Sequence, residues 1–229
     1  MEIGGLQRFS LIDYPGKICA VAFTRGCNFR CPYCHNPELV DPERFSPLIP
    51  TDEIRNFLHK RQGKLDAVTI TGGEPLIHND IGGFVGSIKD MGYAVKIDTN
   101  GSRPTVLESL IHDNLIDYIS MDVKAPLEKY DSVAGVTVDT AAIRHSIDLI
   151  MDSRIDYEFR TTVPRSLLEP DDILAIGRLI AGARRYILQR LVPSKVLDAS
   201  FQTAGTLTDE EFAAIKPCLA SSIDIVTIR

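Results

Sequence analysis

Three cysteines, Cys27, Cys31 and Cys34, occupy one short stretch with the spacing Cys-x-x-x-Cys-x-x-Cys. Thiolates are the usual ligands of iron–sulfur clusters, and a closed cubane cluster takes four of them. A cubane held by this stretch would therefore leave one iron free to bind a substrate or a cofactor. An open coordination position is typical of a metal site that does chemistry rather than one that only stabilises a fold.

Other readings of the cysteines are weaker. Cys19 and Cys218 are expected to be small buried hydrophobic residues, although the sequence leaves Cys218 open as a fourth ligand. A structural zinc site needs a fourth protein ligand, and His35 is too close to Cys34 in sequence to reach the same metal easily. Five cysteines cannot all pair, and nothing else in the chain suggests secretion, which disfavours a disulfide framework.

Composition sets broad limits on function. The chain has 229 residues, 44% of them hydrophobic, and a net charge of -6, which argues against a general nucleic-acid surface. It contains no apolar run of about 18 residues and no basic, apolar signal region at residue 1. We therefore expect a cytoplasmic protein, where thiols remain reduced, with no nucleic-acid partner and no membrane association.

Apolar, β-branched runs alternate with amphipathic segments along the chain. They predict strands at residues 17–25, 66–71, 93–98, 116–122, 156–163, 185–192 and 222–228. They predict helices at residues 51–61, 79–91, 104–112, 139–152, 170–183 and 208–219. This alternation indicates parallel strands joined by helical crossovers. We expect one α/β domain over residues 1–229, with a core at about 17–192 and a C-terminal αβ extension at about 193–229.

Polar residues follow five successive predicted strands. These segments are Arg25-Gly26-Cys27, Thr71-Gly72-Gly73-Glu74-Pro75, Asp98-Thr99-Asn100-Gly101, Asp122-Val123-Lys124 and Arg160-Thr161-Thr162. The C-terminal ends of parallel strands gather on one face of an α/β barrel, so we expect the five segments to surround one pocket. Three of them have a plainer explanation when taken alone: a tight turn at Gly72 and Gly73, a cap at Asp98, and an ion pair between Asp122 and Lys124.

These motifs resemble a known superfamily. Two motifs resemble those of the radical S-adenosylmethionine (SAM) superfamily. They are the cysteine triplet, with Tyr33 before Cys34, and the later segment Thr71-Gly72-Gly73-Glu74-Pro75. Four further segments are similar to those of glycyl-radical-enzyme activases, especially the anaerobic ribonucleoside-triphosphate reductase activating proteins. They are residues 9–17 (FSLIDYPGK), 31–36 (CPYCHN), 98–101 and 122–124. The resemblance implies a partial (β/α)6 barrel of the TIM type, with parallel strands inside and helices outside.

The resemblance also implies an activity. One 4Fe-4S cluster on Cys27, Cys31 and Cys34 would hold SAM at its fourth iron, and reduction would cleave SAM to a 5′-deoxyadenosyl radical. That radical would take a hydrogen atom from a glycine of anaerobic ribonucleoside-triphosphate reductase, leaving a glycyl radical there. A flavodoxin or ferredoxin would supply the electron. The substrate could instead be a different glycyl radical enzyme, such as one like pyruvate formate-lyase, or a small molecule. The alternative of another class is a non-catalytic iron–sulfur or zinc binding protein.

Roles for individual residues follow from the same resemblance, which implies no catalytic residue beyond the cluster and SAM. The implied cofactor-binding set is Tyr33, Gly72, Gly73, Glu74, Asp98, Asn100, Asp122, Lys124 and Arg160. Backbone groups at Gly72 and Gly73 would contact the methionyl amine of SAM, since glycine permits close backbone approach. Glu74 would order that turn, and Tyr33 would border the adenine or act as a packed aromatic residue.

The charged residues of this set have related implied roles. Asp98 and Asp122 resemble acids that hold a monovalent cation near the methionyl carboxylate. Two acids beside a bound carboxylate would otherwise repel it, so either a cation or Lys124 must compensate the charge. Arg160 resembles a basic residue that contacts the cofactor from the end of the fifth strand.

The chain also departs from some activases. No cysteine lies between Cys34 and Thr71, so the ferredoxin-like insertion that carries extra clusters is absent, and we expect a single cluster. The stretch Asp13-Tyr14-Pro15-Gly16 differs from the Asp-Gly-Pro-Gly of shorter activases, which leaves the partner open. Iron and sulfide analysis of anaerobically reconstituted protein should find about four irons per chain. A content of about eight or more would contradict a single cluster.

Substitution of the cysteines gives a direct test of this assignment. Cys31→Ala should abolish reductive cleavage of SAM, because the cluster would lose a ligand that the chain cannot replace nearby. Cys19→Ala should retain most of the cleavage. The measurement is 5′-deoxyadenosine formed under dithionite, and full activity in Cys31→Ala would reject the assignment.

Overall fold

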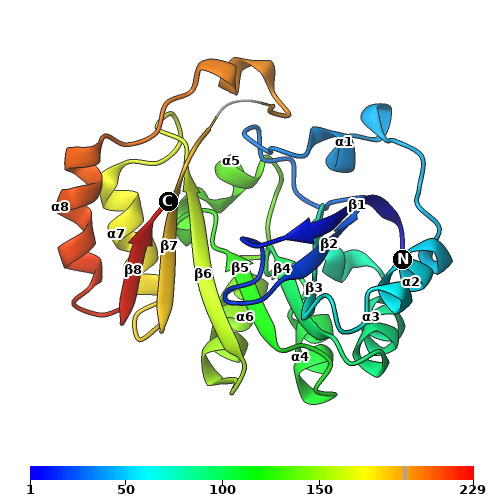
Figure 1. Ribbon diagram of the computed structural model, residues 1–229. Coiled ribbons are helices and arrows are strands. Elements are labelled where there is room, and N and C mark those ends of the chain that lie inside the picture. The colour runs from blue at the N-terminus through cyan, green and yellow to red at the C-terminus, as the bar shows by residue number, and fades with distance from the viewer. Residues whose placement is uncertain (193–194) are drawn as a thin grey trace.

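The computed structural model describes residues 1–192 and 195–229 and is built on one eight-stranded sheet in the order β1 to β8 (Figure 1). The strands are β1 (Ile3–Ser10), β2 (Cys19–Thr24), β3 (Ala67–Gly72), β4 (Ala94–Thr99), β5 (Tyr118–Asp122), β6 (Asp156–Val163), β7 (Arg185–Arg190) and β8 (Ile225–Ile228). Strands β2 to β8 are parallel, and β1 pairs antiparallel with β2. The predicted parallel sheet is confirmed.

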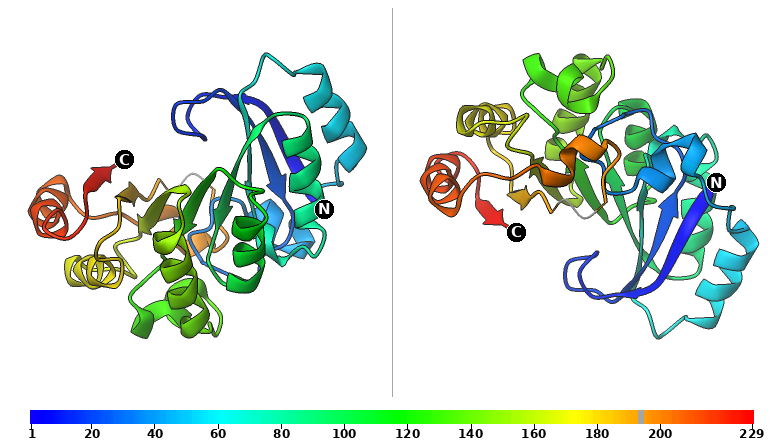
Figure 2. Two further views of the ribbon diagram at one scale, coloured as in Figure 1. Left: turned by 90° about the horizontal axis from the view of Figure 1, so that it is seen from below. Right: turned by 90° about the horizontal axis from the view of Figure 1, so that it is seen from above.

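Helices form the crossovers between the parallel strands. The longer ones are α2 (Thr51–Lys60), α3 (Ile81–Asp90), α4 (Pro104–His112), α6 (Thr140–Asp152), α7 (Pro170–Leu179) and α8 (Asp209–Leu219). The shorter ones are α1 (Pro37–Val40), α5 (Tyr130–Ala134), and the 3₁₀ turns η1 (Pro42–Arg44), η2 (Pro75–Ile77), η3 (Leu127–Lys129) and η4 (Ala199–Thr203). The longer helices lie along the convex side of the curved sheet (Figure 2).

The sheet curves into an arc and leaves β1 and β8 at its two edges, so the barrel is open (Figure 2). The expected partial barrel is confirmed, with β2 to β7 as its six-stranded core. After that core, α8 leads to β8, which pairs with β7 and extends the same sheet. The division into one domain with a C-terminal extension stays a prediction, and the continuity of the sheet supports it.

The two faces of the strands differ in character. Apolar residues such as Ile70 and Ile97 are fully buried beneath the helices in the main hydrophobic core. On the concave side the chain buries polar residues, including Thr69, Lys96 and Glu158, beside a second and smaller cluster of Tyr14, Cys19, Val21, Ala67 and Tyr118. Because successive side chains of a strand point to opposite faces, the sequence of each strand can serve a dry outer core and a polar interior together.

Several elements differ from the sequence-based expectation. The sequence does not predict β1, because Gly4 and Gly5 lower its strand propensity and the strand gains its order by pairing with β2 at an edge. The short helices α1 and α5 are likewise not predicted, since each is below the length at which periodicity is readable. The helix predicted to residue 183 ends at Leu179, where the chain turns toward β7.

The described part of the chain has no helix that combines the length and apolarity needed to cross a bilayer. The cytoplasmic location stays a prediction.

Candidate cluster and cofactor site

Every site residue singled out from the sequence lines one cavity at the C-terminal ends of the strands. The cavity has a volume of about 310 Å³, within the range of about 300 to 1,000 Å³ typical of small-molecule sites. Further residues line the cavity without a role predicted from the sequence: Phe29, His35, Asn36, Val40, Thr71, Thr99, Thr162, Gln189 and Arg190. Most of these adjoin a predicted motif or end a strand, which is the signal that could have identified them.

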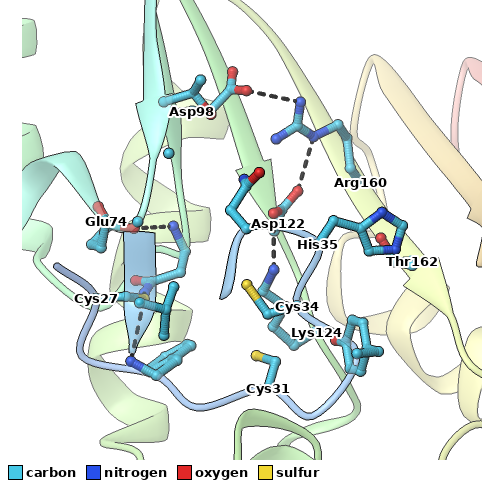
Figure 3. A pocket seen from close by; sticks show the side chains of 18 of the residues that line it. Cys27, Cys31, Cys34, His35, Glu74, Asp98, Asp122, Lys124, Arg160 and Thr162 are labelled. Atoms are coloured by element: carbon cyan, nitrogen blue, oxygen red, sulfur yellow. Dashed lines mark hydrogen bonds and ion pairs between the residues drawn. The ribbon is translucent and has the colours of Figure 1, made fainter. Parts of the chain in front are cut away.

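The cysteine loop connects β2 to α1 and directs its three thiols into the cavity (Figure 3). Cys31 is buried, whereas Cys27 and Cys34 are half-buried. Backbone hydrogen bonds anchor the loop on both sides: the Gly26 N–H donates to the Leu39 carbonyl at 2.7 Å, and the Arg30 N–H donates to the Ala134 carbonyl at 2.7 Å. Neighbouring elements thus hold the loop in place, and within it the Cys34 N–H donates to the Cys31 carbonyl at 3.0 Å.

The protein environment by itself keeps the thiols protonated. Burial raises the pKa of Cys27 to about 12 and that of Cys31 to about 11, and it also raises the pKa of Cys34. The Lys124 ammonium acts in the opposite direction on all three. A bound metal centre would stabilise the thiolate form of these cysteines by its positive charge. Metal binding would therefore release the thiol protons.

The arrangement of ligands distinguishes a cluster from a single ion. Across residues 1–192 and 195–229, no group of three His, Cys, Asp or Glu side chains is placed to share one metal ion. In a cubane each thiolate binds a different iron, so three thiols around one cavity suffice. The Phe29 N–H also donates to the Cys27 Sγ at 3.4 Å, the kind of hydrogen bond that tunes cluster sulfurs. The three cysteines therefore fit an iron–sulfur cluster better than a zinc ion.

The glycine turn after β3 packs directly against the start of the cysteine loop. The Gly73 N–H donates to the Thr24 carbonyl at 2.9 Å, and the Glu74 N–H donates to the Gly26 carbonyl at 2.8 Å. Gly72 has φ +112°, and a Cβ on Gly73 would lie 1.9 Å from the Gly26 oxygen. Only glycine fits these positions, because larger residues would separate the two loops.

Glu74 is a buried residue of the cavity wall and holds neighbouring backbone in place. Its carboxylate accepts hydrogen bonds from the Leu76 N–H at 3.0 Å, the Thr99 hydroxyl at 2.8 Å and the Asn100 N–H at 2.6 Å. Burial raises the pKa of Glu74 to about 7, against the lowering effect of these hydrogen bonds. The side chain therefore joins the turn after β3 to the turn after β4.

Asn100 extends this connection to the cysteine loop. Its side-chain amide donates to the Asn28 side-chain oxygen at 2.9 Å and lies 4.0 Å from the Cys27 Sγ. The chain of contacts from Glu74 through Asn100 to Cys27 links three strand ends across the cavity.

Acids and bases alternate along the other wall of the cavity (Figure 3). The Arg160 Nη1 lies 3.2 Å from an Asp98 oxygen, and the Arg160 Nε lies 2.9 Å from an Asp122 oxygen. The Lys124 Nζ lies 2.9 Å from the second Asp122 oxygen. Burial raises the pKa of both carboxyls, but the neighbouring bases outweigh it and hold the pKa of Asp98 and Asp122 below the usual range.

Lys96 completes this row, although the sequence analysis does not identify it. Its ammonium pairs with the remaining oxygen of Asp98. The spacing of two along β4 was the available signal, because it places Lys96 and Asp98 on the same face of the strand.

The cysteine loop carries three aromatic side chains that line the cavity, Phe29, Tyr33 and His35. Tyr33 is 3% exposed, and its hydroxyl has no hydrogen-bond partner among the described residues. Burial, then the charge of Lys124, lowers the pKa of His35, so its imidazole is neutral near pH 7. Tyr33 therefore offers the cavity a buried polar group that nothing in the described chain satisfies.

The two remaining cysteines lie outside the cavity. Cys19 is fully buried at the opposite end of β2, as predicted, and accepts a hydrogen bond from the Thr69 hydroxyl at 3.7 Å. The prediction for Cys218 is wrong, because this residue is exposed on α8. It is also absent from the cavity lining among the described residues.

The family model of the radical SAM superfamily matches residues 21–165, more than half of the chain. The chain therefore belongs to the radical SAM superfamily. It is also 33% identical over 235 residues to a "putative glycyl-radical enzyme activating enzyme" of Methanocaldococcus jannaschii, covering 99% of this chain and 95% of that protein. This similarity assigns the chain to the family of glycyl-radical-enzyme activases within the superfamily.

Two further relatives match less of the chain. A second M. jannaschii protein with the same description is 27% identical over 192 residues, which is 78% of this chain and 68% of that one. The 7-carboxy-7-deazaguanine synthase of Methanothermobacter thermautotrophicus is 30% identical over 116 residues, which is 50% of this chain and 45% of that one.

Solved structures share the fold at low sequence identity. Streptococcus suis SuiB bound to its precursor peptide SuiA has a TM-score of 0.67 at 12% identity, with 91% of this chain and 48% of SuiB covered. TYW1 with a lysine–pyruvate adduct has a TM-score of 0.61 at 17% identity, with 89% of this chain and 73% of TYW1 covered. These similarities show the partial barrel architecture.

The contacts of Glu74 generate a test of the site's framework. Glu74→Gln should lower the free energy of unfolding by about 1 to 3 kcal/mol, because the new amide places an N–H where the carboxylate accepts one. Denaturant unfolding under anaerobic conditions measures the loss. Affinity for SAM should fall in parallel, since the turns at Gly73 and Asn100 share this anchor.

Glu211→Gln is the matched control. Glu211 also accepts a backbone N–H, from Thr208 in the capping box of α8, and it pairs with Arg165. Glutamine serves equally in a capping box, and an exposed ion pair contributes little to stability because water screens it. Equal effects of the two substitutions would contradict the anchoring role of Glu74.

Proposed function

We propose that this protein cleaves SAM reductively and uses the resulting 5′-deoxyadenosyl radical to generate a glycyl radical on a partner enzyme. The observation that supports this most directly is the convergence of three thiols, a glycine turn and a row of alternating charges on one cavity. These groups come from the ends of successive strands, which the parallel sheet brings together, but the sheet does not require that those ends carry thiols, a glycine turn and paired charges. The same cavity can accommodate a cluster at one wall and a charged ligand at the other.

Cys27, Cys31 and Cys34 would hold one 4Fe-4S cluster, which supplies the electron for cleavage and an open coordination position for SAM. The protein's own task is to position the ligand and to keep water and other hydrogen donors away. The loop fits this task because its backbone is fixed at Gly26 and Arg30 by neighbouring elements.

The polar groups of the cavity match the charges of SAM. The N–H groups of Gly73 and Glu74 already donate to the carbonyls of Thr24 in β2 and Gly26 in the cysteine loop, so a methionyl amine at the turn would meet carbonyl oxygens, which suit a donor. The methionyl carboxylate would be attracted by Arg160 and Lys124, whose positive charges reach the cavity wall. The Tyr33 hydroxyl, which has no hydrogen-bond partner within residues 1–192 and 195–229, would contact the adenosyl part.

We propose anaerobic ribonucleoside-triphosphate reductase as the partner, with a flavodoxin or ferredoxin as the electron donor. The segment 9–17 and the two M. jannaschii relatives described as activating enzymes support a glycyl radical enzyme as the target. The open arc of the sheet is also consistent with a polypeptide substrate, because a glycine on a protein loop must approach the cavity from outside.

A small-molecule reaction is the second candidate. The similarity to 7-carboxy-7-deazaguanine synthase over half of this chain favours it. The near-complete coverage of the first M. jannaschii relative favours the activase instead.

Electron paramagnetic resonance separates these candidates. Reconstituted protein, SAM and dithionite should produce a glycyl radical doublet when anaerobic ribonucleoside-triphosphate reductase is added, because the radical is transferred to the partner's glycine. The partner with that glycine replaced by alanine is the control and should give no doublet.

A doublet only on a pyruvate formate-lyase-like partner would change the assigned target while retaining the activase function. Formation of 5′-deoxyadenosine with no doublet on either partner would support a small-molecule substrate. Absence of 5′-deoxyadenosine from cluster-loaded protein would reject radical SAM chemistry altogether.

A further inference from the structure

The positive charge beside Asp98 comes from the chain itself. Lys96 lies on β4 two residues before Asp98, with a side chain that is 3% exposed, and its ammonium pairs with an Asp98 oxygen. The Lys96 side chain is therefore buried inside the barrel. Burying an ammonium without a negative partner costs free energy, so Lys96 depends on the Asp98 carboxylate beside it.

The remaining carboxylate oxygens of the row are also occupied. The second Asp98 oxygen lies 3.2 Å from Arg160, and the two Asp122 oxygens lie 2.9 Å from Arg160 and 2.9 Å from Lys124. Each of the four oxygens therefore faces a nitrogen that carries positive charge. A bound monovalent cation would need several of these oxygens as ligands, because hard cations are coordinated by oxygen.

The charge balance leads to the same conclusion. Two acids, Asp98 and Asp122, pair directly with three bases, Lys96, Arg160 and Lys124, so each acid already has two positive partners. The next acid along the interior, Glu158, accepts hydrogen bonds from Tyr118 and Ser120. Burial lowers the pKa of the Arg160 guanidinium, but the charges of the two aspartates and then of Glu158 outweigh burial and raise it. A further cation between the two acids would be within a few ångströms of three positive groups, and Coulomb repulsion is strong in a partly buried site.

The monovalent cation expected from the family resemblance therefore does not fit these residues. We propose that the Lys96 ammonium replaces such a cation, so that this protein needs no bound sodium or potassium at Asp98 and Asp122. Lys96 acts as a positioning residue: it engages one Asp98 oxygen and leaves the other to orient the Arg160 guanidinium. The inference deepens the proposed function, but its geometric basis does not depend on SAM binding.

Thermal unfolding tests this proposal directly. Cluster-loaded wild-type protein should melt at the same temperature in NaCl, KCl and N-methyl-D-glucamine chloride of equal ionic strength. Lys96→Met should open a cation site at Asp98, and sodium or potassium at about ten times its dissociation constant should then raise the melting temperature by about 3 to 6 °C. Lys96→Arg should restore the insensitivity of the wild type, because a guanidinium also brings a fixed positive charge.

Lys89→Met is the matched control. Lys89 also forms an ion pair with an aspartate, Asp117, with its Nζ 2.7 Å from the carboxylate, but this pair lies outside the cavity. Its melting temperature should be as insensitive to the cation as that of the wild type. The same response in Lys89→Met and Lys96→Met would show a general effect of lost lysine charge and would overturn the proposal.

Two other outcomes would overturn it. A melting temperature of the wild type that rises specifically in NaCl or KCl would show that a cation binds despite Lys96, and this arm requires no variant to fold. A folded Lys96→Met without any cation response would show that Lys96 does not occupy a cation site. Since none of these measurements includes SAM, failure of the proposed cleavage reaction would appear separately, as absent 5′-deoxyadenosine.

Discussion

Charge compensation inside the open barrel is the constraint on which this site depends. Five charged side chains of the site are largely removed from water: Lys96, Asp98, Arg160, Asp122 and Lys124. Removing an isolated ion from water costs several kcal/mol. Each therefore needs its neighbour, and the loss of one leaves another uncompensated. The row arises from three adjacent strands, so the parallel register of β4, β5 and β6 is what makes it possible.

A second set of contacts joins the row to the cysteine loop. Gly72 and Gly73 let the turn after β3 approach the loop at Gly26, and Glu74 fastens the same turn to Asn100. These glycines thus have a structural reason for being there, independent of any ligand. The result is a rigid frame in which the thiols and the charged wall keep a fixed separation, as a site that must hold two reacting groups requires.

Much of the fold was readable from the sequence. The strand at residues 156–163 and the helix at residues 104–112 were predicted with their observed bounds, because apolar periodicity is strong where one face packs against the core. The antiparallel strand β1 and the short helices were not, since their order comes from pairing and packing rather than from local propensity. Cys218 was assigned to the interior because composition does not reveal which face of α8 it occupies.

By itself, the sequence determined the chemistry available to the protein: three thiols from one loop, a glycine turn, and acids and bases at the ends of successive strands. Tertiary structure alone decided how the charges are shared. Lys96 stands two residues before Asp98 on β4, so the sequence can place both on one face of that strand. Only the neighbouring strands show that Arg160 and Lys124 occupy the other carboxylate oxygens of the row. The physical reason is that residue types and spacing are local properties, whereas the pairing of buried charges depends on which strands lie side by side.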